Sequence, residues 1–242
     1  MSEALLSVRG VGKSFGAIKA LGPVDLDLEP GERLGIIGPN GSGKTTLINC
    51  ISGFFPPDTG SIRYKGRDIT HMPAYRRARL GLSRSFQIPR PFTGMTVIEN
   101  LLVPMDYGDA SGRDELQRAA DVLDAVGLAR RRDDPAESLS QLELRKLELA
   151  RALAASPDIL IADEAMAGLS EGEIDEILTV LFRLNNSGVA VIMIEHIMHA
   201  VMQYSERVIC LETGQIIAEG KPEAIVRSPM VQKVYFGEQT AR

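Results

Sequence analysis

The chain has 242 residues, of which 44% are hydrophobic and 24% are charged, and its formal net charge is -5 at pH 7. A chain of this length and composition can bury the core of one α/β domain with a smaller appendage. Nucleic-acid binders usually carry a basic face, and a net negative charge gives no electrostatic reason to expect one here, so we expect no nucleic acid among its partners.

Two cysteines, Cys50 and Cys210, both lie in apolar segments. This placement favours free, buried thiols in a reducing cytoplasm over a disulfide. The first residues lack the basic start and the long apolar stretch of a signal peptide, and no segment approaches the roughly 18 apolar residues of a membrane span. Any association with a membrane is therefore expected to run through a partner protein.

Residues 5 to 86 are predicted to be largely β-structure. Apolar and alternating runs bounded by turns predict strands at residues 5–9, 24–28, 33–37 and 61–64. Residues 47–51, which follow the loop after the third strand, continue with helical character.

Residues from about 88 to 156 show no strand pattern. Apolar residues recur there at helical spacing over 113–126 and 142–155, and Gly127 suits the end of the first helix. After this helical insert we expect a strand at 159–162, a helix at 173–184, a strand at 189–194 and a closing hairpin of 208–211 with 215–217. The return of alternating strands and helices predicts an α/β fold.

The loop after strand 33–37 has the spacing G-x-x-x-x-G-K-[ST], which suits the binding of a nucleoside triphosphate. Its glycines allow backbone amides to turn inward, Lys44 reaches the β- and γ-phosphates, and the Thr45 hydroxyl can hold Mg²⁺. The order strand, loop, helix favours this interpretation over a plain glycine-rich turn, because the helix amino terminus then points at the phosphates. The residues expected to hold ATP or GTP are Gly38, Pro39, Asn40, Gly41, Ser42, Gly43, Lys44, Thr45 and Thr46.

Three further positions carry candidate chemistry. Asp163 and Glu164 close the apolar strand 159–162, where Asp163 suits Mg²⁺ and Glu164 can polarise an attacking water, although two acids after a strand can also cap a helix. His196 follows strand 189–194 at the same edge and can contact a γ-phosphate, or be an ordinary surface or core histidine. Gln87 can link the metal and phosphate to movement of the insert, or be a solvated loop residue.

Read together, these motifs resemble the ATPase subunit of ATP-binding cassette (ABC) transporters from end to end. The resemblance rests on the order of Phe15, the phosphate loop, Gln87, Leu139-Ser140 leading into 147–153, Asp163-Glu164, Gly168-Leu169-Ser170 and His196. It implies a P-loop NTPase fold of the α/β class with an antiparallel β subdomain and an inserted helical subdomain. Residues 1–242 would form one cassette, with 1–86 and 157–242 as core and β subdomain and 87–156 as helical subdomain.

The resemblance also implies roles for single residues. Phe15 would stack on adenine, although it can equally be a core residue; Thr45, Gln87 and Asp163 would hold Mg²⁺. Lys44, Gln87, Glu164 and His196 would carry catalysis, with Glu164 as the base. Ser140 would cap the γ-phosphate held by a second cassette, and Gly168-Leu169-Ser170 would lie across the seam of that dimer.

The implied partners are integral membrane permease subunits, a second cassette in a homodimer or a heterodimer with a paralogue, and indirectly a substrate-binding protein. The chain would then sit peripherally on the cytoplasmic side of the cell membrane. We expect the permease to contact residues 88–102, which carry Ile88, Pro89, Pro91, Phe92 and Met95 among few charges. The alternative is that these residues pack inside the helical insert.

Within the superfamily, the chain looks most like bacterial branched-chain amino acid importers. That narrower resemblance rests on residues 92–101 after Gln87, on 165–169 and on the tail 231–238. Importers of urea and amides, and the lipopolysaccharide export ATPase, share several of these features. A nucleic-acid or ribosome-associated cassette is disfavoured, because the stretch from Gln87 to Ser140 is too short for a long coiled-coil arm and there is one cassette rather than two.

Two departures from the family pattern bear on activity. Gln141, Leu142 and Glu143 stand where the signature after Leu-Ser normally has two glycines and a glutamine. Side chains there would crowd a phosphate, and Glu143 would add a like charge. Ala165 replaces the proline that usually follows the catalytic Glu, which should alter the stiffness of that loop. A cassette that binds ATP but hardly hydrolyses it therefore stays open as an alternative.

Overall fold

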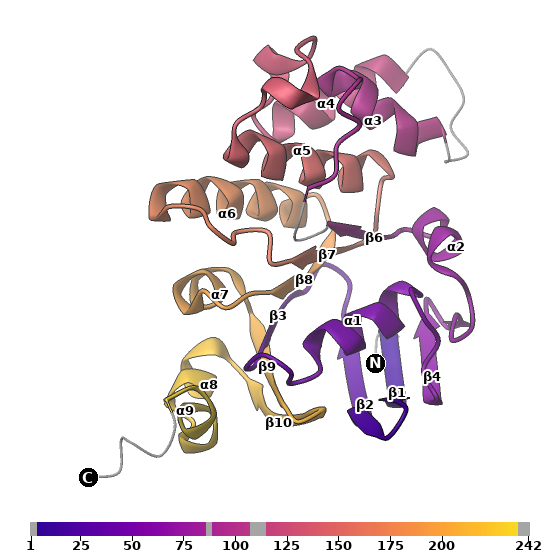
Figure 1. The fold of residues 1–242 in the computed structure, drawn as a ribbon, viewed down its shortest axis with the longest axis vertical. Coiled ribbons are helices and arrows are strands. Elements are labelled where there is room, and N and C mark those ends of the chain that lie inside the picture. The colour runs from indigo at the N-terminus through magenta and orange to yellow at the C-terminus, as the bar shows by residue number, and fades with distance from the viewer. Residues whose placement is uncertain (1–3, 86–88, 107–114, 237–242) are drawn as a thin grey trace.

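The fold is described from a computed structural model, which covers residues 4–85, 89–106 and 115–236. Its strands form two sheets, and a group of helices lies beyond one end of the larger sheet (Figure 1). In these ranges no helix is both long and apolar enough to cross a membrane.

The smaller sheet is antiparallel, with the strand order β2-β1-β4-β5. Its strands are β1 (Leu6–Phe15), β2 (Ile18–Leu28), β4 (Thr59–Tyr64) and β5 (Arg67–Asp68). The strands predicted at 5–9, 24–28 and 61–64 all lie in this sheet, and the first two extend further than the apolar pattern indicated. Bulges interrupt the β1–β2 register after Val8 and after Val11, so the alternation of buried residues is broken there.

The larger sheet has the order β10-β9-β3-β8-β7-β6. It consists of β3 (Arg33–Ile37), β6 (Leu82–Ser85), β7 (Ile159–Asp163), β8 (Ala190–Ile194), β9 (Arg207–Glu212) and β10 (Gln215–Gly220). All pairs are parallel except the β9–β10 hairpin. The carboxyl ends of five strands therefore meet at one edge, which is where open α/β sheets bind ligands.

The helices are distributed over three places. α1 (Lys44–Ser52) lies between the two sheets, while α6 (Glu171–Asn186) and α7 (Met198–Tyr204) lie on the other side of the larger sheet (Figure 1). The inserted group beyond α6 contains α3 (Val97–Asp106), α4 (Glu115–Ala125), α5 (Gln141–Ala154) and the short turns η1 (Ala129–Arg131) and η2 (Ala136–Ser138). The short helices α2 (Ala74–Arg79), α8 (Pro222–Arg227) and α9 (Pro229–Phe236) complete the fold.

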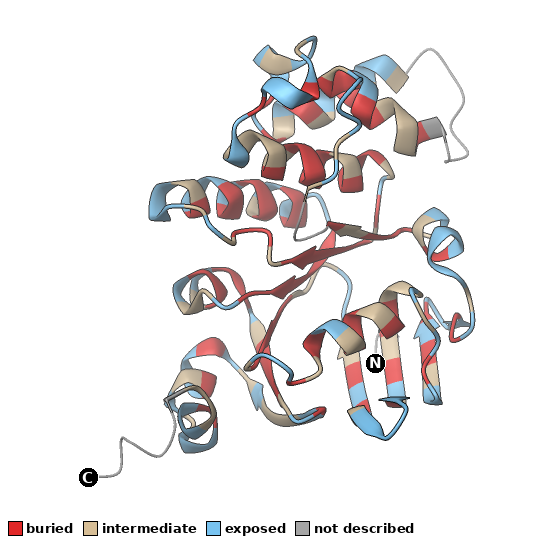
Figure 2. Cartoon of the chain, in the orientation of Figure 1, coloured by how far each residue is buried: buried red, intermediate tan, exposed pale blue. Residues whose placement is uncertain are grey.

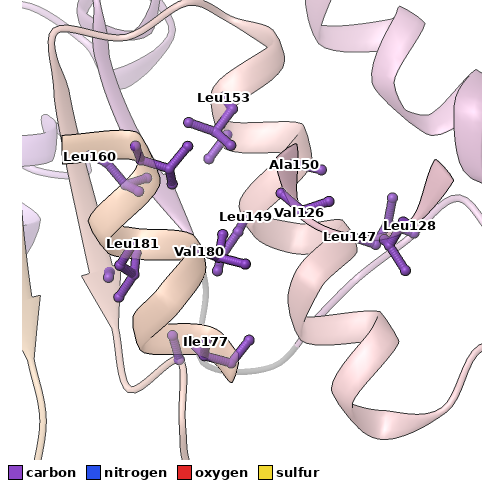
Figure 3. Close-up of a cluster of buried hydrophobic side chains, with 14 of the residues drawn as sticks. Val126, Leu128, Leu147, Leu149, Ala150, Leu153, Leu160, Ile177, Val180 and Leu181 are labelled. Atoms are coloured by element: carbon purple, nitrogen blue, oxygen red, sulfur yellow. The ribbon is translucent and has the colours of Figure 1, made fainter. Parts of the chain in front are cut away.

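The two faces of the larger sheet belong to different cores, because successive side chains of a strand point to opposite faces. Ile159 and Ile161 pack with α1 and the antiparallel sheet, whereas Leu160 and Ala162 pack with the inserted helices. Figure 3 shows Val180 of α6 beside Leu149 of α5, with Leu160 of β7 at the other side of α6. Burial is continuous from the sheet through α6 into α5 (Figure 2), so the inserted helices share a core with the sheet.

Several elements were not predicted. In the region 5 to 86, the helix α2 and the short strands β5 and β6 were not predicted, and α8 and α9 follow the hairpin that was expected to close the chain. α3 and α7 were also missed, and the helix after the phosphate loop begins at Lys44 rather than near Leu47. These elements have ten residues or fewer, which is too short for a helical period to stand out. Cys50 and Cys210 are buried free thiols, as expected.

Candidate functional site

The phosphate loop lies between the end of β3 and the start of α1, in the order expected from the sequence. The Ser42 amide donates to Pro39 O at 3.2 Å, and the Leu47 amide donates to Gly43 O at 2.9 Å where the helix begins. Thr45, in the first turn of α1, is exposed. The helix amino terminus therefore faces the space that the loop encloses, which favours an anion there.

Two glycines of the loop are required by close neighbours. A Cβ added to Gly38 would lie 2.2 Å from Leu211 O, and one added to Gly43 would lie 2.8 Å from Ala20 O. The turn of the β9–β10 hairpin holds the loop from outside, because the Gly214 amide donates to Ser42 O at 2.8 Å. These contacts fix the course of the loop before any ligand is bound, which reduces the cost of ordering it on binding.

Lys44 is buried and rests on the loop itself. Its Nζ donates to Gly38 O at 2.6 Å and to Pro39 O at 3.0 Å, and burial lowers the pKa of this ammonium group. Both Glu164 and Asp163 lie near enough to raise the pKa of Lys44 by their negative charge. The lysine and the two carboxylates thus belong to one site, although they are far apart in the chain.

Asp163 ends β7 and is paired with an arginine that the sequence did not point out. Arg84 of β6 donates from Nη2 to Asp163 Oδ2 at 2.6 Å, and both side chains are only 12% exposed. Arg84 Nη1 also donates to Asn49 Oδ1 of α1 at 2.7 Å. This arginine joins the candidate metal ligand to the helix that follows the phosphate loop. A charged residue inside a short buried strand was the available signal, because such a charge requires a partner.

Glu164 and His196 lie together, as their places after two neighbouring strands predicted. The His196 Nε2 atom is 2.9 Å from Glu164 Oε1. Glu164 has a left-handed backbone with a φ of 48°, which a non-glycine residue adopts only at a cost, and its amide donates to Ile194 O at 2.9 Å. This left-handed turn ends the strand at Glu164, and the hydrogen bond to Ile194 O keeps the residue at the sheet edge. Neither Asp163 nor Glu164 caps α6, since Ser170 does so.

Hydrogen bonds to two different parts of the chain hold the loop after Glu164. Glu195 is 2% exposed and accepts a hydrogen bond at 3.0 Å from the Met166 amide, and Arg145 of α5 donates to Ala167 O at 3.1 Å. Burial, together with the nearby charge of Glu164, raises the pKa of Glu195 to about 7, although hydrogen bonds from the Met166 and His196 amides and the charge of Arg145 act in the opposite direction. Consecutive residues, Glu195 and His196, therefore hold the two ends of the segment that carries the candidate base.

Phe15 and Ser140 belong to two other elements, the end of β1 and the start of α5. Phe15, at the end of β1, is 48% exposed and meets the Phe55 ring edge-on, with centroids 5.4 Å apart, so it is not a core residue. Ser140 is the N-cap of α5: its Oγ accepts from the Glu143 amide at 3.3 Å, and its own amide donates to Glu143 Oε2 at 2.8 Å. The hydrogen bond from the Ser140 amide to the Glu143 carboxylate lowers the pKa of Glu143. The Glu143 carboxylate therefore turns back onto its own helix.

The structure brings Lys44, Asp163, Glu164 and His196 to one edge of the sheet, next to the loop residues named from the sequence. Gln87 and Ile88 lie outside the described residues. In the described part of the segment expected to meet a permease, Val97, Ile98 and Leu101 are buried in the insert, whereas residues 92–95 and Glu99 are exposed. The sequence analysis did not identify three further residues of the site, namely Arg84, Glu195 and Arg145.

A phosphate loop between a parallel strand and a helix, with acidic residues at the same edge, defines a P-loop nucleotide-binding domain. Comparisons with known proteins identify the family of P-loop proteins to which the chain belongs. The family model for the ABC transporter matches residues 21–167. The high-affinity branched-chain amino acid transport ATP-binding protein LivG of Escherichia coli (strain K12) is 38% identical over 98% of this chain and 100% of its own length.

Solved structures of ATP-binding cassettes are also similar to this chain. An ATP-binding cassette of an ABC transporter in its ADP conformation has a TM-score of 0.90 and 32% identity, covering 98% of this chain and 100% of that one. A dimeric cassette in a post-hydrolysis state, bound to ADP and Pi, has a TM-score of 0.79 and 28% identity, covering 90% of this chain and 98% of that one. The chain belongs to the ABC transporter family and is a nucleotide-binding ATPase of that family. The expected fold class is confirmed.

Proposed function

We propose that the chain binds and hydrolyses ATP to power an importer of branched-chain amino acids, docked peripherally on the cytoplasmic side of the cell membrane. The cargo is supported by the similarity to the E. coli transport protein. The chemistry is supported above all by one observation: the Glu164 and His196 side chains meet at 2.9 Å, next to a lysine of the phosphate loop. Urea or amide import and lipopolysaccharide export are the alternatives for the cargo.

The loop suits the phosphates of ATP by its own geometry. It is preformed, its lysine is held inside it, and the buried Ser42 Oγ has no hydrogen-bond partner among the described residues. A buried polar atom without a partner at such a position fits a polar ligand. Residues 38–46 would hold the phosphates, with Lys44 leaving the loop carbonyls for the β- and γ-phosphates, and Phe15 would contact the base.

The chemistry of the oxygen donors also fits Mg²⁺. Asp163 offers a carboxylate and Thr45 an exposed hydroxyl, the ligand types that Mg²⁺ prefers. We assign Thr45, Asp163 and Gln87 to the metal, which would neutralise charge on the phosphates. Glu164 would take a proton from the attacking water, and His196 would orient Glu164 and contact the γ-phosphate.

Two substitutions test this division of roles. Lys44→Ala should weaken ATP binding, because the charge that reaches the phosphates is lost. Glu164→Gln should leave binding intact and slow hydrolysis by about 10²-fold or more, the scale of general-base catalysis. Binding is measured with a fluorescent ATP analogue, and hydrolysis by phosphate release with the partner that supports turnover.

Glu171→Gln is the matched control, since it removes an exposed carboxylate at the start of α6 outside the site. This variant should bind and hydrolyse as the native protein does. Native turnover by Glu164→Gln would remove Glu164 from the mechanism, and native ATP affinity of Lys44→Ala would contradict the assignment of the loop.

We further propose that the working unit is a head-to-tail dimer in which Ser140 faces the ATP of the second cassette. The similar dimeric cassette bound to ADP and Pi supports it. A second candidate function, a cassette that binds ATP and hydrolyses it slowly, is favoured by residues 141–143. Their side chains and the Glu143 cap occupy the amino terminus of α5, where the phosphate would approach. A heterodimer with a paralogue would carry this defect in one site only.

The permease contact is proposed for a groove of about 340 Å³ beside the exposed part of residues 89–95. Phe54 and Tyr75 on its rim are 72% and 58% exposed, although both are large and apolar. Exposed aromatic residues beside a groove are typical of protein interfaces. α1, α2, β6, α3 and α5 all contribute to the groove, so a partner seated there would contact the core and the inserted helices together.

A further inference from the structure

The last described helix, α9, reaches back to the phosphate loop. The hydroxyl oxygen of Tyr235 accepts a hydrogen bond at 2.6 Å from the amide of Gly38, the first residue of the loop. The two residues are far apart in the chain, and α9 is not otherwise part of the site. α9 packs beside α8 at the outer end of the larger sheet, near β9 (Figure 1).

Tyr235 is held in place by packing. Its side chain lies against a small core that contains Ile37 of β3, Val208 and Cys210 of β9, and residues of α8 and α9. Burial raises the pKa of the Tyr235 phenol to about 12, so the hydroxyl is neutral at physiological pH. The position of the hydroxyl is therefore determined by a fixed ring, and that hydroxyl determines where the Gly38 amide points.

Gly38 is fixed on its other atoms as well. The Gly38 carbonyl accepts the hydrogen bond from Lys44 Nζ at 2.6 Å, and its Cα lies so close to Leu211 O that no side chain fits. One glycine thus connects the tyrosine of the C-terminal helix, through its amide, with the lysine of the phosphate loop, through its carbonyl. Displacement of Gly38 would move the acceptor that holds Lys44.

We propose that Tyr235 is a positioning residue for nucleotide binding, through which α9 sets the orientation of Gly38 and the resting place of Lys44. The inference rests on the proposed binding of ATP at this loop. Tyr235 acts on the loop before nucleotide arrives, so its effect falls on affinity and not on the hydrolysis step. Without the hydroxyl the Gly38 amide loses its partner, and the loop must either leave that amide unpaired or shift.

Tyr235→Phe tests the proposal, because it removes one oxygen and keeps the packing ring. Tyr204→Phe is the matched control: Tyr204 is fully buried where Tyr235 is half-buried, and its hydroxyl likewise bonds the backbone, donating to Leu181 O at 3.1 Å, but it lies in α7 outside the loop. We expect Tyr235→Phe to weaken binding of ATP and ADP by roughly three- to tenfold, the worth of one hydrogen bond. The maximal hydrolysis rate should be unchanged, and Tyr204→Phe should bind as the native protein does.

Hydrogen exchange of the Gly38 amide, measured without nucleotide, provides a second test. Exchange there should be faster in Tyr235→Phe and unchanged in Tyr204→Phe. The proposal is overturned if the two variants show equal nucleotide affinity, or if Gly38 exchange does not respond to Tyr235→Phe. Failure of the native protein to bind nucleotide would instead refute the proposed function, and the exchange measurement would still decide whether Tyr235 holds the loop.

Discussion

The residues next to the candidate base Glu164 differ in how far they are buried as well as in what they contact. Glu195 and His196 are consecutive, yet one carboxylate is 2% exposed and holds the Met166 amide, while the neighbouring imidazole reaches Glu164. Burial disfavours the charged form of Glu195, and Arg145 compensates only in part. The chain therefore keeps a carboxyl group at this position at some cost to its stability.

The raised pKa of Glu195 predicts that the stability of the fold depends on pH. The pKa of Glu195 is raised from 4.5 to about 7 on folding, so the folded state holds a proton that the unfolded state releases. Its stabilising contribution is complete below pH 4.5 and is lost as the pH rises through 7. Glu195→Gln has no proton to lose, so relative to the native protein it should gain on the order of 2 to 3 kcal/mol between pH 5 and pH 8.

Thermal unfolding of both proteins at pH 5 and pH 8 measures this. The melting temperature of Glu195→Gln, relative to the native protein, should rise between the two pH values. Glu171→Gln, which removes an exposed carboxylate, should show no such rise. Parallel behaviour of Glu195→Gln and the native protein would mean that Glu195 is ionised in the fold at neutral pH.

The first turn of helix α5 has to be stable by itself and would also have to bind a phosphate. This turn carries a complete capping box between Ser140 and Glu143, which satisfies backbone amides that would otherwise lack partners. The same turn would have to receive a phosphate from a second cassette. Gln141 and Leu142 favour the helix over an open approach, because side chains other than glycine stiffen its first turn.

Restoring Gly, Gly and Gln at positions 141, 142 and 143 should therefore have opposite effects on activity and stability. ATP turnover of the isolated protein should rise, since phosphate can approach the helix terminus. Two glycines in the first turn should lower the free energy of unfolding by about 1 to 2 kcal/mol. Glu143→Gln alone is the control, because it keeps the capping geometry and removes only the charge. Unchanged turnover and unchanged ATP-driven dimerisation of the triple variant would show that these residues are tolerated.

Elements with strong local signals were predictable, and the remainder depended on contacts between distant segments. β3, the phosphate loop and α1 followed from an apolar run, glycine spacing and helical character. α5 was predicted within one residue at each end because its period is sustained over 14 residues. α2 has only six residues, three of them arginines, and Arg77 is buried against the carbonyls of Cys50 and Ile51, a contact that no local pattern shows.

The same distinction applies to the site. Glu164 and His196 were found because each directly follows an apolar strand, so the sheet edge brings them together. Tyr235 lies in the tail 231–238 that carried the narrower resemblance, but its role was not predicted, because that role depends on a contact with Gly38, nearly the whole chain away. Glu195 stands beside a named residue, but its importance depends on burial and on the Met166 amide, which the sequence does not reveal.

For the whole molecule, the groove lined by α1, α2, β6, α3 and α5 revises the expected permease contact. Val97, Ile98 and Leu101 pack inside the insert, and Phe92 lies beneath the Arg151 guanidinium at 4.9 Å, so part of the predicted segment is structural. Phe54 and Tyr75 are more exposed and flank the groove. They are the better positions at which to disturb a partner.

The double variant Phe54→Glu with Tyr75→Glu should lose co-purification with a branched-chain amino acid permease, while its ATP affinity stays near the native value. The charges would have to be buried on docking, which is costly without a partner charge. Leu116→Glu with Met230→Glu is the matched control, because these residues are 56% and 55% exposed outside the groove. Assembly and uptake by the first variant would place the contact elsewhere, and the absence of any membrane partner for the native chain would contradict the transporter assignment.

The central position of β3 has a consequence for how the protein is made. β3 and its phosphate loop are translated early, but the strands on both sides come much later, since Arg33 pairs with Val191 and Leu34 with Arg207. The Gly214 turn that braces the loop comes later still. During most of synthesis the nascent chain therefore carries an apolar strand with two unpaired edges, and such edges promote aggregation. The segment that gives the molecule its activity is also the one that must be protected longest on the ribosome.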